Sequence, residues 1–327
     1  MRAIVAHRLG PPEVLELQAL PCPEPGPGQV LIELHATGVN FSETERRRGR
    51  YATPRLPWCP GAEGAGPIVA LGPDVAPTLL GQRVAFWALP PATTGTYAEY
   101  AVAPVNALFH LSASISFDTG AALPLQGLTA YGLAFLAAKI RPGMSVLVHA
   151  AAGGVGQLLV QMVRNQGARL FATTSTSQKA SIVARLGAEA FLYGDDLPQR
   201  IARATDGHGL DLIYDSVGQA TQTQSLAMLA PYGELLHFGE ASGPPRAIEP
   251  DQLYERSLKV GAFSLNTDRD PGLWVKARRD LLNWVEKGTL KVSVSQRFPL
   301  AQASEAHRLL ENRATTGKVI LHPGERA

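Results

Sequence analysis

The sequence predicts an α/β protein, with a doubly wound parallel sheet in one domain and short strands in a second. Three observations support this prediction. A glycine turn joins a buried strand to an amphipathic helix near the middle of the chain, strands alternate with helices from there to Phe263, and Pro and Gly punctuate short strands in the first third. Parallel neighbours need a crossover, which a helix provides, so the alternation indicates a parallel sheet. The length of 327 residues favours two domains.

The glycine turn follows the apolar strand 146–148 and reads Ala151-x-Gly153-x-x-Gly156, the dinucleotide fingerprint with alanine in place of its first glycine. The residues after it are apolar at helical spacing: Val155, Leu158, Leu159, Met162 and Val163. Gly153 lets the backbone approach a pyrophosphate, and Gly156 lets helix and strand pack closely. The amides at the helix N-terminus supply positive partial charge for phosphates. A chance match is the alternative among 32 glycines, but the flanking strand and helix favour a dinucleotide site.

The first third of the chain is predicted to form a barrel of short strands. These strands cover 3–6, 14–17, 30–34, 67–70, 83–87 and 97–102. After a turn at 39–42, a polar helical segment extends through Arg48.

The pattern becomes helical at Phe117, where Ser116 or Asp118 can cap a helix. Further strands are predicted at 169–173, 190–192, 210–215, 234–238 and 259–263, with helices at 178–186, 197–204 and 221–229. The last segment is predicted to form helices at 274–287 and 301–311 and strands at 292–294 and 318–321, and to return to the first domain. We therefore expect one domain from 1–122 and 266–327, and a second from 123–265.

Composition limits the range of partners and compartments. A net charge of +2 with dispersed basic residues favours neither a nucleic-acid nor a membrane partner. The cluster 46–50 is interpreted as a solvated helix end, with a role near an anionic cofactor or substrate as the alternative. Cys22 and Cys59 lack the spacings of disulfide or zinc sites. No signal-peptide core and no apolar run of spanning length is present, so a cytoplasmic protein is expected.

Several short motifs carry a family resemblance when they are taken together in this order. They lie at 38–41, 61–66, 127–130, 150–156, 214–218, 238–239 and 313–318. On these motifs the whole chain resembles the zinc-free quinone oxidoreductase branch of the medium-chain dehydrogenase/reductase superfamily. The resemblance implies a Rossmann domain between the two parts of a GroES-like, partly open barrel that forms the catalytic domain. It also implies hydride transfer from NADPH to a quinone or another α,β-unsaturated carbonyl.

The positions that would bind zinc carry other residues. Zinc-dependent alcohol dehydrogenases of this superfamily have cysteine where this chain has Asn40 and histidine where it has Ala62, and they add a four-cysteine lobe that is missing here. Asparagine and alanine supply neither thiolate nor imidazole, so no metal site is expected. Without a Lewis acid, alcohol oxidation is disfavoured. A conjugated acceptor suits the site better, because its distant oxygen takes the charge and hydrogen bonds can hold it.

The resemblance assigns Asn40, Tyr51 and Thr129 to the nicotinamide and substrate site. Turn formation is the alternative for Asn40, and helix packing for Thr129. Tyr51 could donate a hydrogen bond to an enolate, or it could pack against Pro54 and Pro57.

Three other polar residues are given no catalytic role. Glu45 stands where this branch often has tyrosine, which puts quinone in doubt as the natural substrate. Glu63 is interpreted as a structural carboxylate. His149 is interpreted as a satisfied core histidine rather than a proton shuttle.

The segment 173–179 predicts the choice of cofactor. An NAD-specific site has Asp or Glu about 20 residues beyond the turn. Here the segment has no acid, and it contains hydroxyls and Lys179. The resemblance adds Tyr193 and Arg313 around a 2′-phosphate, so NADPH is predicted; solvated helix ends at Lys179 and Arg313 are the alternative. The residues assigned to the cofactor are Ala151, Gly153, Gly154, Val155, Gly156, Thr174, Ser175, Lys179, Tyr193, Ser216, Phe238, Ser242 and Arg313.

Two other functions and an assembly state follow from the same sequence. One alternative is enoyl-thioester reduction, with Tyr51 as proton donor. The other is a catalytically quiet NADPH-binding or RNA-binding protein, which the lack of a basic stripe disfavours. The apolar strand 259–263 should lie at the edge of the parallel sheet, where pairing with a second copy would give a homodimer.

Overall fold

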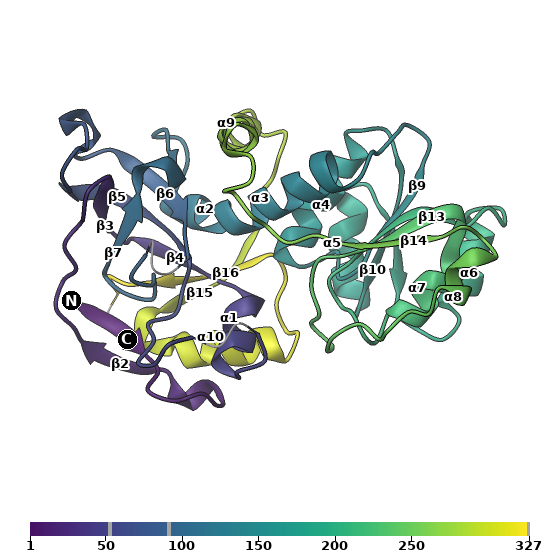
Figure 1. The fold of residues 1–327 in the computed structure, drawn as a ribbon, viewed down its shortest axis with the longest axis horizontal. Helices are drawn as coiled ribbons and strands as arrows, with labels where there is room; N and C mark the ends of the chain where they lie inside the picture. The colour runs from purple at the N-terminus through teal and green to yellow at the C-terminus, as the bar shows by residue number, and fades with distance from the viewer. Residues whose placement is uncertain (52–53, 90–92, 326–327) are drawn as a thin grey trace. The chain divides into compact units, whose positions relative to one another are not determined.

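The computed structural model describes residues 1–51, 54–89 and 93–325, and the chain divides into two units (Figure 1). Unit 1 comprises Met1–Gln126 together with Gly272–Ala327, and unit 2 comprises Gly127–Pro271.

Unit 2 is built on six parallel strands. They are β9 (Ser145–Val148), β10 (Arg169–Thr174), β11 (Glu189–Leu192), β12 (Leu210–Asp215), β13 (Leu229–His237) and β14 (Lys259–Ala262). Their spatial order is β11-β10-β9-β12-β13-β14. The order runs outward from the β9/β12 pair in both directions, which is the arrangement of a Rossmann sheet. The predicted doubly wound parallel sheet is therefore confirmed.

Helices connect these strands, as parallel pairing requires. They are α4 (Gly154–Arg164), α5 (Ser177–Arg185), α6 (Leu197–Ala204), α7 (Gln222–Met228) and α8 (Asp251–Tyr254), preceded by a π-helical segment at Leu133–Ala137. All residues of strand β9 are buried. Burial on both faces of the sheet explains why Val146, Leu147 and Val148 form a continuous apolar run. The ends of β9 and β12 thus define the edge at which a dinucleotide binds in such sheets.

Unit 1 combines both ends of the chain in one sheet. Its strands are β3 (Gln29–Glu33), β4 (Ala36–Val39), β5 (Glu63–Leu71), β6 (Arg83–Trp87), β7 (Tyr100–Pro104), β8 (Leu108–His110), β15 (Val294–Pro299) and β16 (Lys318–His322). The order is β15-β16-β4-β5-β3-β7, with β6 on β5 and β8 on β6. A separate pair joins β1 (Arg2–Val5) to β2 (Glu16–Ala19). The antiparallel pairing of β16 with β4 sets Ile320 opposite Gly38.

The helices of unit 1 lie between these strands in the chain. They are α1 (Phe41–Arg47), α2 (Phe117–Ala122), α9 (Pro271–Glu286) and α10 (Ala303–Glu311), and α3 (Pro124–Gly132) crosses from unit 1 into unit 2. Short 3₁₀ turns occur at Pro12–Val14, Pro77–Leu79, Val105–Ala107 and Leu300–Gln302.

Some predicted elements differ from the observed ones. The prediction missed β4, β8 and α8, and it began β5 four residues too late. The strand predicted at 14–17 starts with a 3₁₀ turn at Pro12–Val14, and the strand predicted at 292–294 is β15, which starts at Val294. Strand β4 reads Ala-Thr-Gly-Val, which has little strand propensity, but all four residues are buried. Tertiary packing determines such a strand more than its local sequence does.

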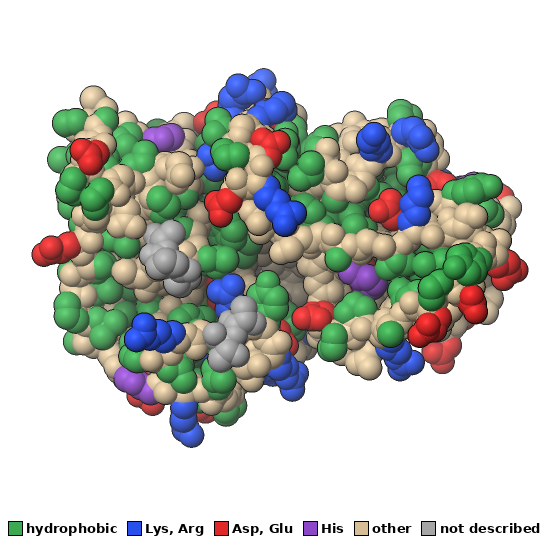
Figure 2. All heavy atoms as spheres, in the orientation of Figure 1, with side chains coloured by type: hydrophobic (Ala, Val, Ile, Leu, Met, Phe, Trp, Pro, Cys, Tyr) green, Lys and Arg blue, Asp and Glu red, His purple; other side chains and the backbone are tan. Residues whose placement is uncertain are grey.

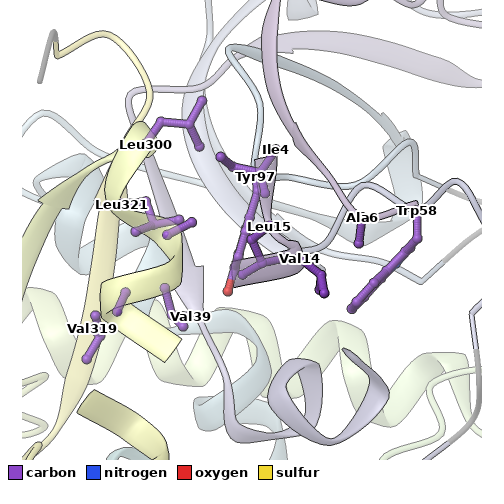
Figure 3. Packing of buried hydrophobic residues seen from close by; sticks show 12 residues of the cluster. Ile4, Ala6, Val14, Leu15, Val39, Trp58, Tyr97, Leu300, Val319 and Leu321 are labelled. Atoms are coloured by element: carbon purple, nitrogen blue, oxygen red, sulfur yellow. The ribbon is translucent and has the colours of Figure 1, made fainter. Parts of the chain in front are cut away.

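A hydrophobic core joins the two chain ends within unit 1 (Figure 3). Its side chains come from β1, β4, β16, the 3₁₀ turns at Pro12–Val14 and Leu300–Gln302, and loops of the first hundred residues: Ile4, Ala6, Val14, Leu15, Val39, Trp58, Tyr97, Leu300, Val319 and Leu321. Burial of a large apolar side chain stabilises a fold by about 1.5–3 kcal/mol. The C-terminal strands are thus held in place by residues of the first hundred.

Charged side chains are distributed over the surface. On the face shown in Figure 2, Lys and Arg lie in several separate groups with Asp and Glu between them. Among the described residues, no helix has the length and apolarity to cross a membrane.

Candidate cofactor and active site

The glycine turn in unit 2 has the geometry of a close backbone approach. Gly153 caps α4, and its N–H donates to Ala150 O over 3.0 Å. Ala150 itself has a φ of 48°, which is unusual for a residue with a Cβ. A Cβ on Gly156 would lie 2.7 Å from both Ala150 O and Ala151 Cα, so only glycine fits there. The turn therefore brings the N-terminus of α4 to the end of β9, where a phosphate can accept from its amides.

Tyr193 supports this turn from the end of β11. The Ala150 N–H donates to the Tyr193 hydroxyl over 2.8 Å. The Tyr193 ring also stacks on His149, with 5.9 Å between centroids and 14° between planes. The structure thus places Tyr193 beside the turn; its predicted contact with a phosphate remains a prediction.

His149 is a satisfied core residue, as the sequence suggested. The ring is buried, with Nδ1 2.7 Å from Thr173 Oγ1 and Nε2 2.9 Å from Ser225 Oγ. Ser225 Oγ donates to Thr221 O, so Nε2 carries the hydrogen and Nδ1 accepts from Thr173. Burial lowers the pKa of His149, which keeps the imidazole neutral.

The acid-free segment leads directly into a helix. Thr174 is buried and donates to Thr176 O over 3.2 Å, while Ser175 is exposed. Thr176 caps α5 by accepting the Lys179 N–H at 3.2 Å. Lys179 is partly exposed in the first turn of that helix. The segment from Thr174 to Lys179 therefore contains hydroxyls, a lysine and the N-terminus of α5; its predicted contact with a 2′-phosphate remains a prediction.

Ser216, Phe238 and Ser242 lie in loops that follow β12 and β13. The Phe238 N–H donates to Asp215 O over 2.8 Å, and the Ser242 hydroxyl donates to Val217 O over 2.7 Å. These bonds tie the two loops together. Both loops follow the carboxyl ends of parallel strands, as the glycine turn does, and this edge of such a sheet binds ligands.

Sequence reasoning missed Asp215 and His237 at this same edge. The buried Asp215 carboxylate accepts from Val217 N at 2.6 Å and Thr221 Oγ1 at 2.7 Å, which fixes the loop after β12. His237 Nδ1 lies 3.6 Å from Asp215 Oδ2. Burial lowers the pKa of His237, and Asp215 opposes that shift. The sequence signal that could have identified this pair was Asp215, an acid at the end of the predicted strand 210–215.

Asn40 lies in a buried polar network in unit 1, immediately after β4. Its side-chain Nδ2 donates to Glu63 Oε1 over 2.8 Å, and its Oδ1 accepts from Lys318 Nζ over 2.5 Å. Lys318 also donates to Glu63 Oε1, and Leu125 N donates to Glu63 Oε2 over 2.8 Å. Glu63 is fully buried in this network, which agrees with the structural carboxylate expected from the sequence.

Glu43 extends the network on the other side of Asn40. Its carboxyl Oε2 accepts from Asn40 N over 2.5 Å and lies 3.5 Å from the Tyr97 hydroxyl. That hydroxyl is 3.0 Å from His307 Nε2. Burial raises the pKa of Glu43 to about 7, and burial with the nearby Arg47 lowers the pKa of His307 to about 3. Glutamate three residues after Asn40 is a capping-box pattern, which was the sequence signal for this contact.

Tyr51 and Thr129 are both partly exposed. Tyr51 is 43% exposed, and the Arg46 guanidinium lies over its ring at 5.6 Å from the centroid. Thr129 belongs to α3 in unit 2, whereas Asn40, Tyr51 and the exposed Arg313 belong to unit 1. The roles predicted for these residues remain predictions.

The arginine cluster is only partly solvated. Arg47 is 0% exposed and forms an ion pair with Glu311, so the solvated interpretation is wrong for Arg47. Arg48 bonds to Glu311 at 2.8 Å and to Glu45 at 3.2 Å. The charge of Glu45 is therefore balanced by Arg48, which follows at the end of the same helix.

Within residues 1–51, 54–89 and 93–325, no three His, Cys, Asp or Glu side chains are grouped so that they could hold a metal ion. Cys59 packs against Pro60 and Tyr97 carbonyls, and burial raises the pKa of its thiol to about 12.

Comparison with known proteins identifies relatives along the whole chain. The family model "Alcohol dehydrogenase GroES-like domain" matches residues 26–113, and "Zinc-binding dehydrogenase" matches residues 186–321. A quinone oxidoreductase of Pseudomonas aeruginosa is 38% identical over 96% of this chain and 97% of its own. A 2-haloacrylate reductase of Burkholderia sp. is 33% identical over 98% of each chain. The crystal structure of Escherichia coli quinone oxidoreductase complexed with NADPH superposes with a TM-score of 0.92, at 34% identity over 99% of this chain and 100% of that one.

Proposed function

Because the chain belongs to the zinc-independent quinone oxidoreductase branch of the medium-chain dehydrogenase/reductase superfamily, we propose that it is an NADPH-dependent quinone oxidoreductase. It transfers hydride from NADPH to a quinone or another α,β-unsaturated carbonyl. The observation that carries this proposal is the turn at Gly156, which leaves no space for a Cβ and leads into an acid-free, hydroxyl-rich segment at the next strand. Both features suit a phosphorylated dinucleotide.

The chain's own residues would bind and orient the cofactor. The amides of Gly154, Val155 and Gly156, in the first turn of α4, would bind the pyrophosphate. Thr174, Ser175, Lys179 and Tyr193 would bind the 2′-phosphate, and the Tyr193 hydroxyl also supports the turn. Ser216, Phe238 and Ser242 serve the ribose and nicotinamide end. NADPH supplies the hydride, so the protein's task is orientation and stabilisation of charge.

In the catalytic domain, formed by 1–122 and 266–327, Asn40 contacts the acceptor or the nicotinamide, and Tyr51 offers a phenol to the reduced acceptor. Thr129, near the start of the cofactor domain 123–265, contacts the nicotinamide. The Asn40 amide is held by Glu63 and Lys318, which gives it one orientation before any ligand arrives.

A second candidate is the reduction of unsaturated acids or thioesters. The exposed phenol of Tyr51 beside the Arg46 cation favours it, because such a pair can hold an anionic or enolate oxygen. The name of the Burkholderia relative, 2-haloacrylate reductase, points to the same class of acceptor.

We further propose a cytoplasmic homodimer. Strand β14 lies at the end of the parallel sheet, where its unpaired side can add a strand from a second copy. The two free thiols, Cys22 and Cys59, are suited to a reducing compartment. Light scattering that gives a monomer at micromolar concentration would contradict the dimer.

The function is tested by following NADPH oxidation with matched panels of 1,4-quinones, enones, enoyl thioesters and simple alcohols. Turnover of quinones or enones with NADPH, without oxidation of alcohols by NADP, is expected. If only thioesters react and Tyr51→Phe abolishes that reaction, the second candidate replaces the first. If no acceptor reacts although NADPH binds, the protein is a catalytically quiet cofactor-binding protein.

A further inference from the structure

Four buried polar side chains meet at Asn40. Asn40 follows β4, Glu43 lies on α1, Glu63 begins β5, and Lys318 begins β16. None of the four is more than 5% exposed. Two carboxyl groups and one ammonium are therefore buried together, and the carboxyl group that the ammonium does not compensate bears a penalty when it ionises.

The Asn40 amide has one possible orientation in this network. Lys318 Nζ donates to its Oδ1 at 2.5 Å, and its Nδ2 donates to Glu63 Oε1 at 2.8 Å. A half-turn of the amide would place its NH₂ against the ammonium and its oxygen against the carboxylate, and both contacts would be repulsive. The ammonium on Oδ1 also polarises the amide, which strengthens its N–H groups as donors.

One N–H of the amide is only weakly engaged. Nδ2 carries two hydrogens, and Glu63 takes one of them. The other points to Glu43 Oε1 at 3.4 Å, near the limit of a hydrogen bond. The charge on Glu43 thus determines how strongly this second hydrogen is held, because a carboxylate accepts more strongly than a carboxylic acid.

We propose that Glu43 is a positioning residue that competes with the acceptor for the second amide hydrogen of Asn40. As a carboxylate it retains this hydrogen; as a carboxylic acid it releases it to the acceptor oxygen on which negative charge develops. Glu43 neither forms nor breaks a bond in the reaction: the hydride comes from NADPH, and solvent supplies the proton. The inference rests on the proposed function, in which Asn40 contacts the acceptor.

The surroundings of Glu43 raise its pKa to near neutral pH, so that both its acid and its carboxylate form are populated there. Burial raises its pKa to about 7, with Lys318 opposing and Glu63 adding to the shift. The Tyr97 hydroxyl lies 3.5 Å from Glu43 Oε2 and 3.0 Å from His307 Nε2, and burial keeps His307 neutral. Its single hydrogen can go to His307 when Glu43 is an acid and to Glu43 when Glu43 is a carboxylate. The acid form is therefore accommodated by a chain from Glu43 through the Tyr97 hydroxyl to His307 Nε2.

The test compares wild type with Glu43→Gln, which has the same shape and carries no charge. At saturating NADPH, wild-type kcat/KM for a neutral quinone should fall about fivefold as pH rises through neutrality, the effect of one hydrogen bond. Glu43→Gln should keep a level profile. Calorimetric binding of the oxidised quinone without NADPH should show the same contrast. Glu305→Gln makes the same change on the exposed side of α10 and should retain the wild-type profile.

If kcat/KM or the affinity for the quinone falls with rising pH in Glu43→Gln as much as in wild type, the proposal is overturned. If that variant does not fold, Glu43→Asp withdraws the carboxylate by one methylene while keeping its charge. A level profile in Glu43→Asp supports competition for the hydrogen, and a decline there shows a through-space effect of charge and overturns it. Absence of turnover by the wild type with every acceptor contradicts the proposed function instead, and the calorimetric comparison still decides on Glu43.

Discussion

The backbone N–H of Ala150 donates to the hydroxyl of Tyr193 over 2.8 Å, so a side chain at the end of β11 holds the turn at the end of β9. The turn needs such support, because Ala150 has a positive φ that costs a residue with a Cβ on the order of 1 kcal/mol or more. Tyr193 thus has a role in shaping the cofactor site that is separate from any contact with a phosphate.

Tyr193→Phe should weaken NADPH and NADH binding by a similar factor of about five, because one neutral hydrogen bond contributes about 1 kcal/mol and both cofactors use the turn. Fluorescence titration of the two cofactors measures this. A loss confined to NADPH would show that the hydroxyl contacts the 2′-phosphate directly.

Lys179→Ala should weaken NADPH about tenfold or somewhat more and leave NADH nearly unchanged. A charge-assisted hydrogen bond contributes roughly 1.5–3 kcal/mol. NADH has no 2′-phosphate, so its binding does not depend on this bond. The same titration provides the measurement, with Tyr193→Phe as its counterpart. Equal losses for both cofactors, or a wild type that prefers NADH, would contradict the assignment.

Gly156→Ala should abolish tight cofactor binding and lower the free energy of unfolding by about 1–3 kcal/mol, the usual cost of overpacking. The new Cβ would lie 2.7 Å from backbone atoms of Ala150 and Ala151, which cannot move without deforming the turn. Gly153→Ala is the matched control for stability alone, because its Cβ would be 3.3 Å from the nearest such atom and its φ of −74° suits alanine. Equal melting temperatures for wild type and Gly156→Ala would refute this account of the turn.

Glu311→Gln should destabilise the protein more than Arg47→Met. The first change leaves the buried Arg47 without its carboxylate, a loss of about 3–5 kcal/mol when a buried pair is broken. The second leaves Glu311 with Arg48 at 2.8 Å. It also removes Nε and Nη1 atoms that find no hydrogen-bond partner in the described part of the chain. Urea denaturation of the two variants gives the order, and the reverse order would be inconsistent with the pairing.

Acid should destabilise the protein through His307. Its pKa is lowered to about 3 in the folded state, chiefly by burial, whereas the unfolded chain takes up a proton below about 6.5. The contribution of His307 to the free energy of unfolding is therefore complete above pH 6.5 and is lost as pH falls toward 3. At about 1.4 kcal/mol per pKa unit, His307→Asn should reduce the acid loss by a few kcal/mol. Parallel stability curves for wild type and variant between pH 4 and 7 would exclude this role.

Local pattern was enough to predict the parallel sheet, the turn and the acid-free segment. The structure of a run such as Val146–Val148 followed by Gly153 and Gly156 can be predicted from that run alone, because strand burial, turn conformation and helix spacing are all set within a few residues. The absence of an acid between 173 and 179 is likewise visible in the sequence alone.

The partners of buried charges were decided only by the tertiary structure. Lys318 meets Asn40 across 278 positions of sequence, because β16 pairs with β4, and a pairing of that kind leaves no local signal. Arg47 reads as one of several solvated arginines until α10 brings Glu311 to it. The sequence determined the scaffold and the chemistry available on it, since these depend on short-range geometry. Folding determined which charges are buried together, since that depends on which distant strands and helices become neighbours.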